Sequence, residues 1–188
     1  MIILGLDPGS RVTGYSVLSQ RGSEYSTLDC GVLRLTETDD HGERLRMIYA
    51  RITELVKLYS PEECAVETPV YGKDPLAMLK LGRAQAACML AVINRGLHVT
   101  EYYPKAVKKA ITGRGNASKE QVAFMLHKLI DIQQNSLPND ATDALAVAWC
   151  HAMRRKKDLI TGKPRSHQNS KGNSWSDFVK HNPERVRE

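Results

Sequence analysis

The hydrophobic and polar residues of this chain follow two kinds of pattern along its length. Short apolar runs bounded by turn residues are typical of β-strands, and uninterrupted runs suit strands that are buried on both faces. The segments of this kind are 2–6, 13–18, 25–35, 64–66 and 98–102. The first three follow one another closely, which indicates an antiparallel meander.

Apolar residues at helical spacing occupy the intervals between the later strands. The predicted helices are 41–59, 75–95, 104–111, 118–129 and 138–155. Local signals mark some of their ends: Gly96 suits a C-terminal cap, and Ser118 with Gln121 has the pattern of a capping box. Three strands followed by alternating helices and strands predict an α/β fold with a five-stranded mixed sheet flanked by helices.

Length and a change of composition near Lys156 set the expected domain organisation. The 188 residues suffice for one domain with an appendage, and 41% of them are hydrophobic, which is enough for a core. We therefore expect a folded domain at 1–156. Residues 157–188 are rich in Lys, Arg, Ser, Asn, Gly and Pro, so we expect a basic, disordered tail there.

Composition also excludes several classes of protein. No purely apolar stretch of about 18 residues is present to span a membrane, and no basic leader precedes the first apolar run. The cysteines are far apart and form no C-x-x-C pair, so reduced, buried thiols are expected. They are Cys30, Cys64, Cys88 and Cys150. These features predict a cytoplasmic protein with no membrane partner.

The net charge of +6 is unevenly distributed. Residues 1–72 hold 7 Lys/Arg and 11 Asp/Glu, a net −4, whereas residues 73–128 hold 10 and 3, a net +7. An acidic region beside a basic one suits a polyanionic substrate such as nucleic acid. A solvated helical face with a basic, disordered end explains the same numbers, so charge alone leaves both interpretations open.

Four carboxylates form the candidate site. Asp7 and Glu67 end two apolar strands, and Asp140 and Asp143 lie three residues apart at the start of a predicted helix. Positions i and i+3 share a helix face, so the second pair can approach the sheet rim that holds the first. Each acid alone also has a structural explanation, as a turn former, a solvated strand end or a helix-start anion.

The combination of these acids favours a metal site. Clustered carboxylates repel one another unless a cation lies between them, and a divalent metal is the usual occupant. Two Mg²⁺ ions about 3.5–4 Å apart need a bridging carboxylate, and Asp7 on a central strand is the natural bridge. We therefore predict a metal-dependent phosphoryl-transfer site.

Five segments closely resemble the RuvC family of Holliday junction resolvases. They are ILGLDPGSRVTGYSVL (3–18), AVETPVYGKD (65–74), LKLGRAQ (79–85), VKKAITGRGNASKEQV (107–122) and NDATDALAVAWCH (139–151). The resemblance implies an RNase H-like fold and a bacterial, cytoplasmic homodimer. It implies Mg²⁺, with Mn²⁺ as a substitute, and paired symmetric nicks in a four-way DNA junction during recombination and repair. A branch-migration motor complex is a further implied partner.

The resemblance also assigns roles to residues of this chain. In register, the four acidic metal ligands of the family fall on Asp7, Glu67, Asp140 and Asp143. The DNA-contacting lysines fall on Lys108 and Lys119, and the basic segment adds Lys73, Lys80 and Arg114 as residues that grip the DNA arms. Where the family commonly has an aromatic pair that probes unstacked bases, this chain has Val70 and Tyr71, so Tyr71 is the remaining candidate for stacking.

Lys119 also stands out without the resemblance. It occupies the first turn of a predicted helix, where the helix dipole disfavours a cation. A bound phosphate beside the lysine and the helix-start N–H groups would offset that cost. The alternative is a freely solvated surface lysine.

Three other functions fit parts of the sequence. A related RNase H-like nuclease could process structured RNA, although the contexts of Lys108 and Lys119 favour junction DNA. An actin-like ATPase also begins with a strand, an acid and glycines, but no second phosphate loop is present. A catalytically silent junction-binding module would bind the same DNA and yield no products.

Overall fold

A single mixed sheet organises the chain in the computed structural model, which describes residues 1–161 except 37, 71, 73 and 135. Its strand order is β3-β2-β1-β4-β5. The strands are β1 (Ile2–Asp7), β2 (Val12–Arg21), β3 (Glu24–Arg34), β4 (Glu63–Glu67) and β5 (Val99–Tyr102). β1, β2 and β3 form an antiparallel meander, whereas β1, β4 and β5 run parallel. The predicted five-stranded mixed sheet is confirmed.

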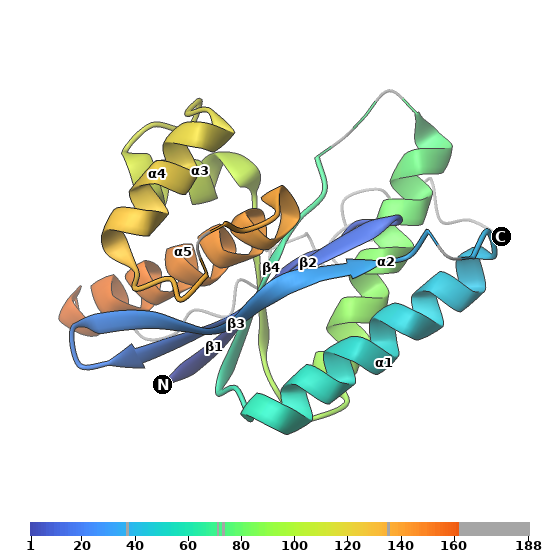
Figure 1. Cartoon of the computed structure of the whole chain (residues 1–188), viewed down its shortest axis with the longest axis horizontal. Helices are drawn as coiled ribbons and strands as arrows, with labels where there is room; N and C mark the ends of the chain where they lie inside the picture. The colour runs from blue at the N-terminus through green and yellow to red at the C-terminus, as the bar shows by residue number, and fades with distance from the viewer. Residues whose placement is uncertain (37, 71, 73, 135, 162–188) are drawn as a thin grey trace, which may run out of the picture. The chain divides into compact units, whose positions relative to one another are not determined.

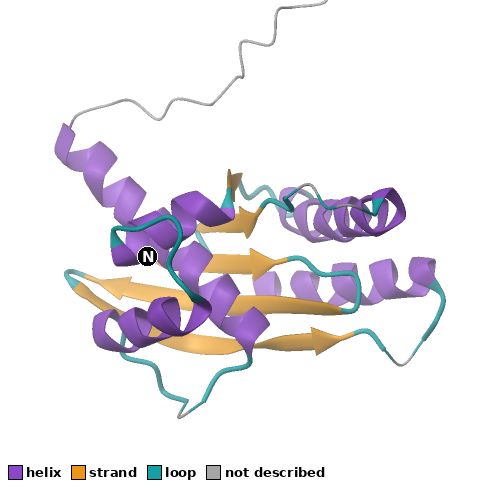
Figure 2. Cartoon of the chain, turned by 90° about the horizontal axis from the view of Figure 1, so that it is seen from above, coloured by secondary structure: helices purple, strands orange, loops and turns teal. Residues whose placement is uncertain are grey.

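Helices cover both faces of the sheet (Figure 1). They are α1 (His41–Tyr59), α2 (Pro75–Ile93), α3 (Pro104–Thr112), α4 (Lys119–Leu129) and α5 (Asn139–Thr161). α1 and α2 pack on one face, and α3, α4 and α5 lie on the other, so the strands form a middle layer (Figure 2).

Alternation along the strands creates two hydrophobic cores. Ile3 and Ala65 pack with α3, α4 and α5, whereas their neighbours Leu4 and Val66 pack with α1 and α2. All four side chains are fully buried. Strands buried on both faces have no polar positions to show an alternating pattern, which explains the uninterrupted apolar runs.

Capping side chains fix the helix starts at the expected places. Asp40 accepts a hydrogen bond from the backbone N–H of Glu43 at the start of α1. Ser118 and Gln121 form the predicted capping box of α4. These local bonds satisfy N–H groups that have no partner inside the helix.

The last helix is longer than its sequence pattern predicts. We expected an end near residue 155, but α5 continues to Thr161, so the expected disorder is wrong for 157–161. The added residues include Lys156, Lys157 and Leu159, which are good helix formers. The chain divides into two units, Met1–Arg154 and Arg155–Glu188. The tail predicted from 162 onward lies outside the described residues.

Helix α2 is long and predominantly apolar. It is long and apolar enough to cross a membrane by length and composition alone, with a hydropathy of 1.5 over its best 18-residue window. A core helix of a soluble protein passes the same test, and α2 buries Ala84, Cys88 and Val92 against the rest of the fold. The helix is not a purely apolar stretch, because Lys80 and Arg83 interrupt it, so the composition test does not contradict the expectation of no membrane partner.

Two glycines let α5 lie directly on the sheet. A Cβ on Gly14 would lie 1.9 Å from the carbonyl oxygen of Asp140, and one on Gly5 would lie 2.2 Å from that of Ala144. Such distances are impossible for a real side chain, so any other residue at these positions would push the helix away. Glycine inside a strand often marks this kind of close backbone approach.

We predict that Gly14→Ala destabilises the protein by roughly 1–3 kcal/mol or more, as other overpacked cores do. The added methyl group has no free space, because it meets helix backbone rather than a flexible side chain. Urea unfolding followed by circular dichroism measures the effect.

Gly82→Ala on α2 is the matched control, because nothing lies within 4 Å of its added methyl group. Alanine is the better helix former, so the control should keep or raise stability by up to about 1 kcal/mol. Equal stability of Gly14→Ala and the wild type would contradict the close approach of α5.

Candidate active site

The four predicted acids come from three elements that meet at one edge of the sheet. Asp7 is the last residue of β1 and Glu67 the last residue of β4, and these strands are parallel neighbours. The carboxyl ends of parallel neighbours lie at the same edge. Asp140 and Asp143 belong to the first turns of α5.

The approach of α5 at Gly14 brings its acids to that edge. Gly14 pairs directly with Asp7 across β1 and β2. The carbonyl oxygen of Asp140 lies over Gly14, so the start of α5 is next to the end of β1. Residues separated by more than 130 positions thereby become neighbours.

Burial and mutual repulsion raise the pKa of two of the acids. Burial raises the pKa of Asp7 to about 7, with further contributions from the charges of Asp143 and Asp140. Burial also raises the pKa of Glu67 to about 8, and Asp7 and Asp143 add to the increase. The four carboxylates therefore share one electrostatic environment.

The carboxylates do not converge on one coordination point in the part of the chain that the structure describes. No group of three or more His, Cys, Asp or Glu side chains there is arranged to hold a metal ion. The predicted acids are close enough to repel one another, but their oxygens do not form a ready-made metal cage. Oxygen-only donors still fit a hard divalent cation by their chemistry.

Lys119 supplies a cation to this cluster. Its Nζ lies 2.7 Å from Oδ2 of Asp143, and this hydrogen bond raises the pKa of Lys119. The lysine also lowers the pKa values of Asp7 and Glu67, against the larger effects that raise them. The alternative of a freely solvated lysine is therefore wrong. The electrostatic cost of a cation in the first turn of α4 is offset by the carboxylates of Asp143 and Asp140 on α5.

The other predicted DNA-contacting residues lie at different distances from the acids. Lys108 on α3 is close enough to Glu67 to lower the pKa of that carboxyl group slightly. Lys80 is exposed on α2. Tyr71 and Lys73 lie outside the described residues.

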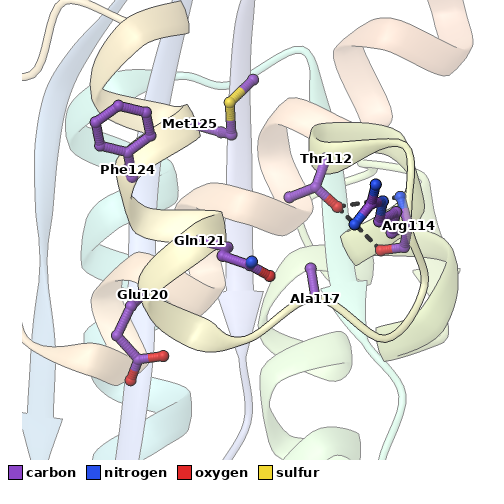
Figure 3. Close-up of a pocket in the computed structure, with 7 residues that line it drawn as sticks. All are labelled: Thr112, Arg114, Ala117, Glu120, Gln121, Phe124 and Met125. Atoms are coloured by element: carbon purple, nitrogen blue, oxygen red, sulfur yellow. Dashed lines mark hydrogen bonds between the residues drawn. The ribbon is translucent and has the colours of Figure 1, made fainter.

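Arg114 borders a surface pocket of about 480 Å³ between α3 and α4 (Figure 3). The lining residues are Thr112, Arg114, Ala117, Glu120, Gln121, Phe124 and Met125. The backbone N–H of Arg114 donates to Oγ1 of Thr112, which fixes the loop that follows α3. The pocket shares the start of α4 with Lys119, and it contains none of the four acids.

Sequence analysis missed a polar group beneath α5. His151 is almost fully buried, and its ring nitrogens contact Tyr102 on β5 and Glu63 on β4. A histidine inside an apolar helix segment was the available signal, but its partners lie about 50 and 90 residues away. Only the tertiary structure identifies them.

Comparison with known proteins gives consistent matches along the chain. The family profile described as "Crossover junction endodeoxyribonuclease RuvC" matches residues 3–151. A protein of that name from Salinibacter ruber is 45% identical over 188 residues, covering all of both chains. One from Cytophaga hutchinsonii is 42% identical and covers 99% of this chain and 88% of its own.

Solved structures agree with the sequence matches. The Thermus thermophilus RuvC structure has a TM-score of 0.76 at 31% identity, covering 84% of this chain and 96% of that chain. The structure described as T. thermophilus RuvC in complex with Holliday junction substrate gives 0.78 at the same identity and coverage. The α/β fold is thus of the expected RNase H-like type.

We predict that Asp7→Asn raises the stability of the protein at high pH when measured in a chelator. The folded-state pKa values of Asp7 and Glu67 lie above their ordinary values of 3.8 and 4.5. Their protonated forms therefore stabilise the fold below about pH 4, and this contribution is lost as the pH rises through 7 and 8. At about 1.4 kcal/mol per pKa unit, the gain at pH 8.5 should be roughly 2–4 kcal/mol.

Chemical unfolding at pH 4 and pH 8.5 provides the measurement. Glu24→Gln, at an exposed position at the start of β3, is the control and should change stability by less than about 0.5 kcal/mol at either pH. A gain for Asp7→Asn that is the same at both pH values would rule out repulsion and burial as its cause.

Proposed function

Because the chain belongs to the RuvC family of crossover junction endodeoxyribonucleases, we propose that it resolves four-way DNA junctions by paired symmetric nicks. The observation that carries the proposal is the electrostatic coupling of Asp7 and Glu67 to Asp143 at one edge of the sheet. The reaction is hydrolysis of phosphodiester bonds, in recombination and repair of bacterial DNA in the cytoplasm.

The carboxylates of Asp7, Glu67, Asp140 and Asp143 are the proposed metal ligands. Family membership makes the nuclease metal-dependent, and the all-oxygen donor set favours Mg²⁺, with Mn²⁺ as a substitute. When bound, two such ions would neutralise charge on the scissile phosphate and activate a water molecule for in-line attack. The products would be 5′-phosphate and 3′-hydroxyl ends that can be ligated.

The protein side chains contribute ionisation and positioning. Asp7 and Glu67, with pKa values near 7 and 8, must lose their protons before they can bind a cation, so cutting should increase as the pH rises through this range. Lys119 holds Asp143 at 2.7 Å. A cation that takes its place would leave the ammonium group free to face the substrate phosphate.

Basic residues around the acids are proposed to hold the DNA. Lys108 lies near Glu67, Arg114 lies in the loop after α3, and Lys80 is exposed on α2. Tyr71 and Lys73, which follow Glu67 in the sequence, complete the proposed set. The T. thermophilus relative has been solved with a Holliday junction substrate, which supports the same kind of substrate here.

An open apolar face on α2 supports a two-fold dimer. Leu76, Leu79, Leu90 and Ile93 are exposed by 70, 50, 52 and 49%. Together with Arg83 and Ala86 they follow a spacing of three and four residues, which is the seam of a helix pair. A second copy of α2 would cover this face, and each subunit would then present one site to one strand.

We predict that Asp7→Asn abolishes cutting while junction binding stays within about twofold. A direct ligand is removed, and changes to residues that merely support metal ligands already reduce metal affinity or activity by 10–100-fold. Cutting should therefore fall by more than about 100-fold on a synthetic mobile four-way junction in Mg²⁺ or Mn²⁺, with both nicks mapped.

Asp39→Asn is the control, because this carboxylate is fully exposed and lies on none of the elements that carry the four acids. Full cutting by Asp7→Asn would refute the assignment of the acids. Preferential cutting of structured RNA by the wild type would instead favour an RNA-processing nuclease, and binding without products would favour a silent junction-binding module.

We predict that Leu90→Glu converts the dimer to monomers at micromolar concentration, because it places a charge in the apolar seam. Analytical ultracentrifugation measures the mass, and loss of simultaneous cutting on opposed strands should accompany dissociation. Leu58→Glu on α1 is the control, because it makes the same substitution at a leucine that is 70% exposed. This variant should remain dimeric. A dimeric Leu90→Glu protein would exclude α2 as the interface.

A further inference from the structure

A buried chain of hydrogen bonds ties α5 to two strands of the sheet. Oη of Tyr102 lies 2.8 Å from Nδ1 of His151, and Nε2 of His151 lies 2.6 Å from Oε2 of Glu63. Tyr102 and His151 are exposed by only 5 and 8%, and the side chain of Glu63 by 14%. Most polar side chains this deeply buried in proteins are hydrogen-bonded.

Donors and acceptors can be matched at both hydrogen bonds of His151. In one such arrangement Nε2 of His151 donates to an ionised Glu63, because a carboxylate without a proton can only accept hydrogen bonds. Burial raises the pKa of Tyr102, which favours the protonated phenol, and in the same arrangement its O–H donates to Nδ1 of His151. The guanidinium of Arg154 lies over the Tyr102 ring, 5.9 Å from its centre.

His151 lies on the same face of α5 as Asp140. His151 follows Asp140 by eleven residues, which is three helical turns or about 16 Å along α5. Along this face α5 contacts β2 where Asp140 meets Gly14, β1 where Ala144 meets Gly5, and β4 where His151 meets Glu63.

These three contacts do not constrain the helix equally. Backbone lying on glycine sets how close α5 comes to the sheet, but it resists sliding along the helix axis only weakly. Hydrogen bonds weaken steeply when their angles change, so the pair made by His151 resists an axial shift more strongly than the two glycine contacts do. A shift there would move Asp140 and Asp143 relative to Asp7 and Glu67 by the same amount.

We infer that His151 is a positioning residue for the metal ligands on α5, acting through Glu63 and Tyr102. The inference rests on the proposed function, since it concerns the affinity of the same carboxylates for a divalent cation. Groups hydrogen-bonded directly to metal ligands are typically worth 10–100-fold in metal affinity or activity, and we expect the lower end of this range for a contact that acts along the helix. His151 does not touch the reacting groups.

The test is Mn²⁺ binding to the full-length, DNA-free protein by titration calorimetry. His151→Phe keeps a ring of similar size but removes both hydrogen bonds, and its Mn²⁺ affinity should fall about tenfold. Junction binding should stay within about twofold. The Mn²⁺ concentration for half-maximal cutting should rise by the same factor as the loss of affinity, and excess Mn²⁺ should restore cutting.

Tyr102→Phe is the gentler variant, because it removes a single hydroxyl group, and its Mn²⁺ affinity should fall by about threefold. It carries the test by itself if His151→Phe does not fold. Trp149→Phe is the matched control on α5. It alters the buried ring pair with Tyr25, whose ring centres are 4.8 Å apart. This control should lower Tm and leave Mn²⁺ affinity unchanged.

The outcomes separate the two proposals. If both variants lose thermal stability but bind Mn²⁺ like the wild type, His151 is merely structural and the inference is overturned, while the nuclease assignment stands. If the wild type neither binds Mn²⁺ nor cuts a junction, the proposed function fails and this inference fails with it.

Discussion

The backbone of α5 lies against β1 and β2 at a distance that glycine alone permits, and the candidate site depends on this contact. Gly5 and Gly14 provide flat places on the sheet where a side chain would collide with helix carbonyl groups. Because Gly14 pairs with Asp7, the same contact that packs the helix also sets Asp140 beside the first acid. The close packing of α5 on Gly14 therefore also determines the position of Asp140 next to Asp7.

That contact forces together groups that repel one another. Asp7 and Glu67 are partly buried, and burial is the main cause of their raised pKa values near 7 and 8, to which repulsion from neighbouring acids adds. The ion pair between Lys119 and Asp143 offsets part of this repulsion with a charge from the neighbouring helix. Repulsion among these carboxylates favours the binding of a divalent cation, which would neutralise their charge.

Much of the fold could be predicted from the sequence, because local signals were unambiguous. The capping box at Ser118 and the apolar stripe of α1 placed those helices within a residue or two. The end of α5 was missed because charged residues such as Lys157 suit a helix as well as a disordered tail. The four acids were found because strand ends and helix starts are recognisable. The partners of Lys119 and His151 were not, since contacts between distant segments leave no local pattern.

The assembly of the site from distant segments bears on how the protein is made. The two strand acids emerge from the ribosome long before α5 is synthesised, and the helix acids cannot join them until α5 docks on the glycines. A nascent chain that ends before α5 therefore lacks Asp140 and Asp143, which are half of the candidate ligand set. Completion of the candidate site is therefore coupled to completion of the domain.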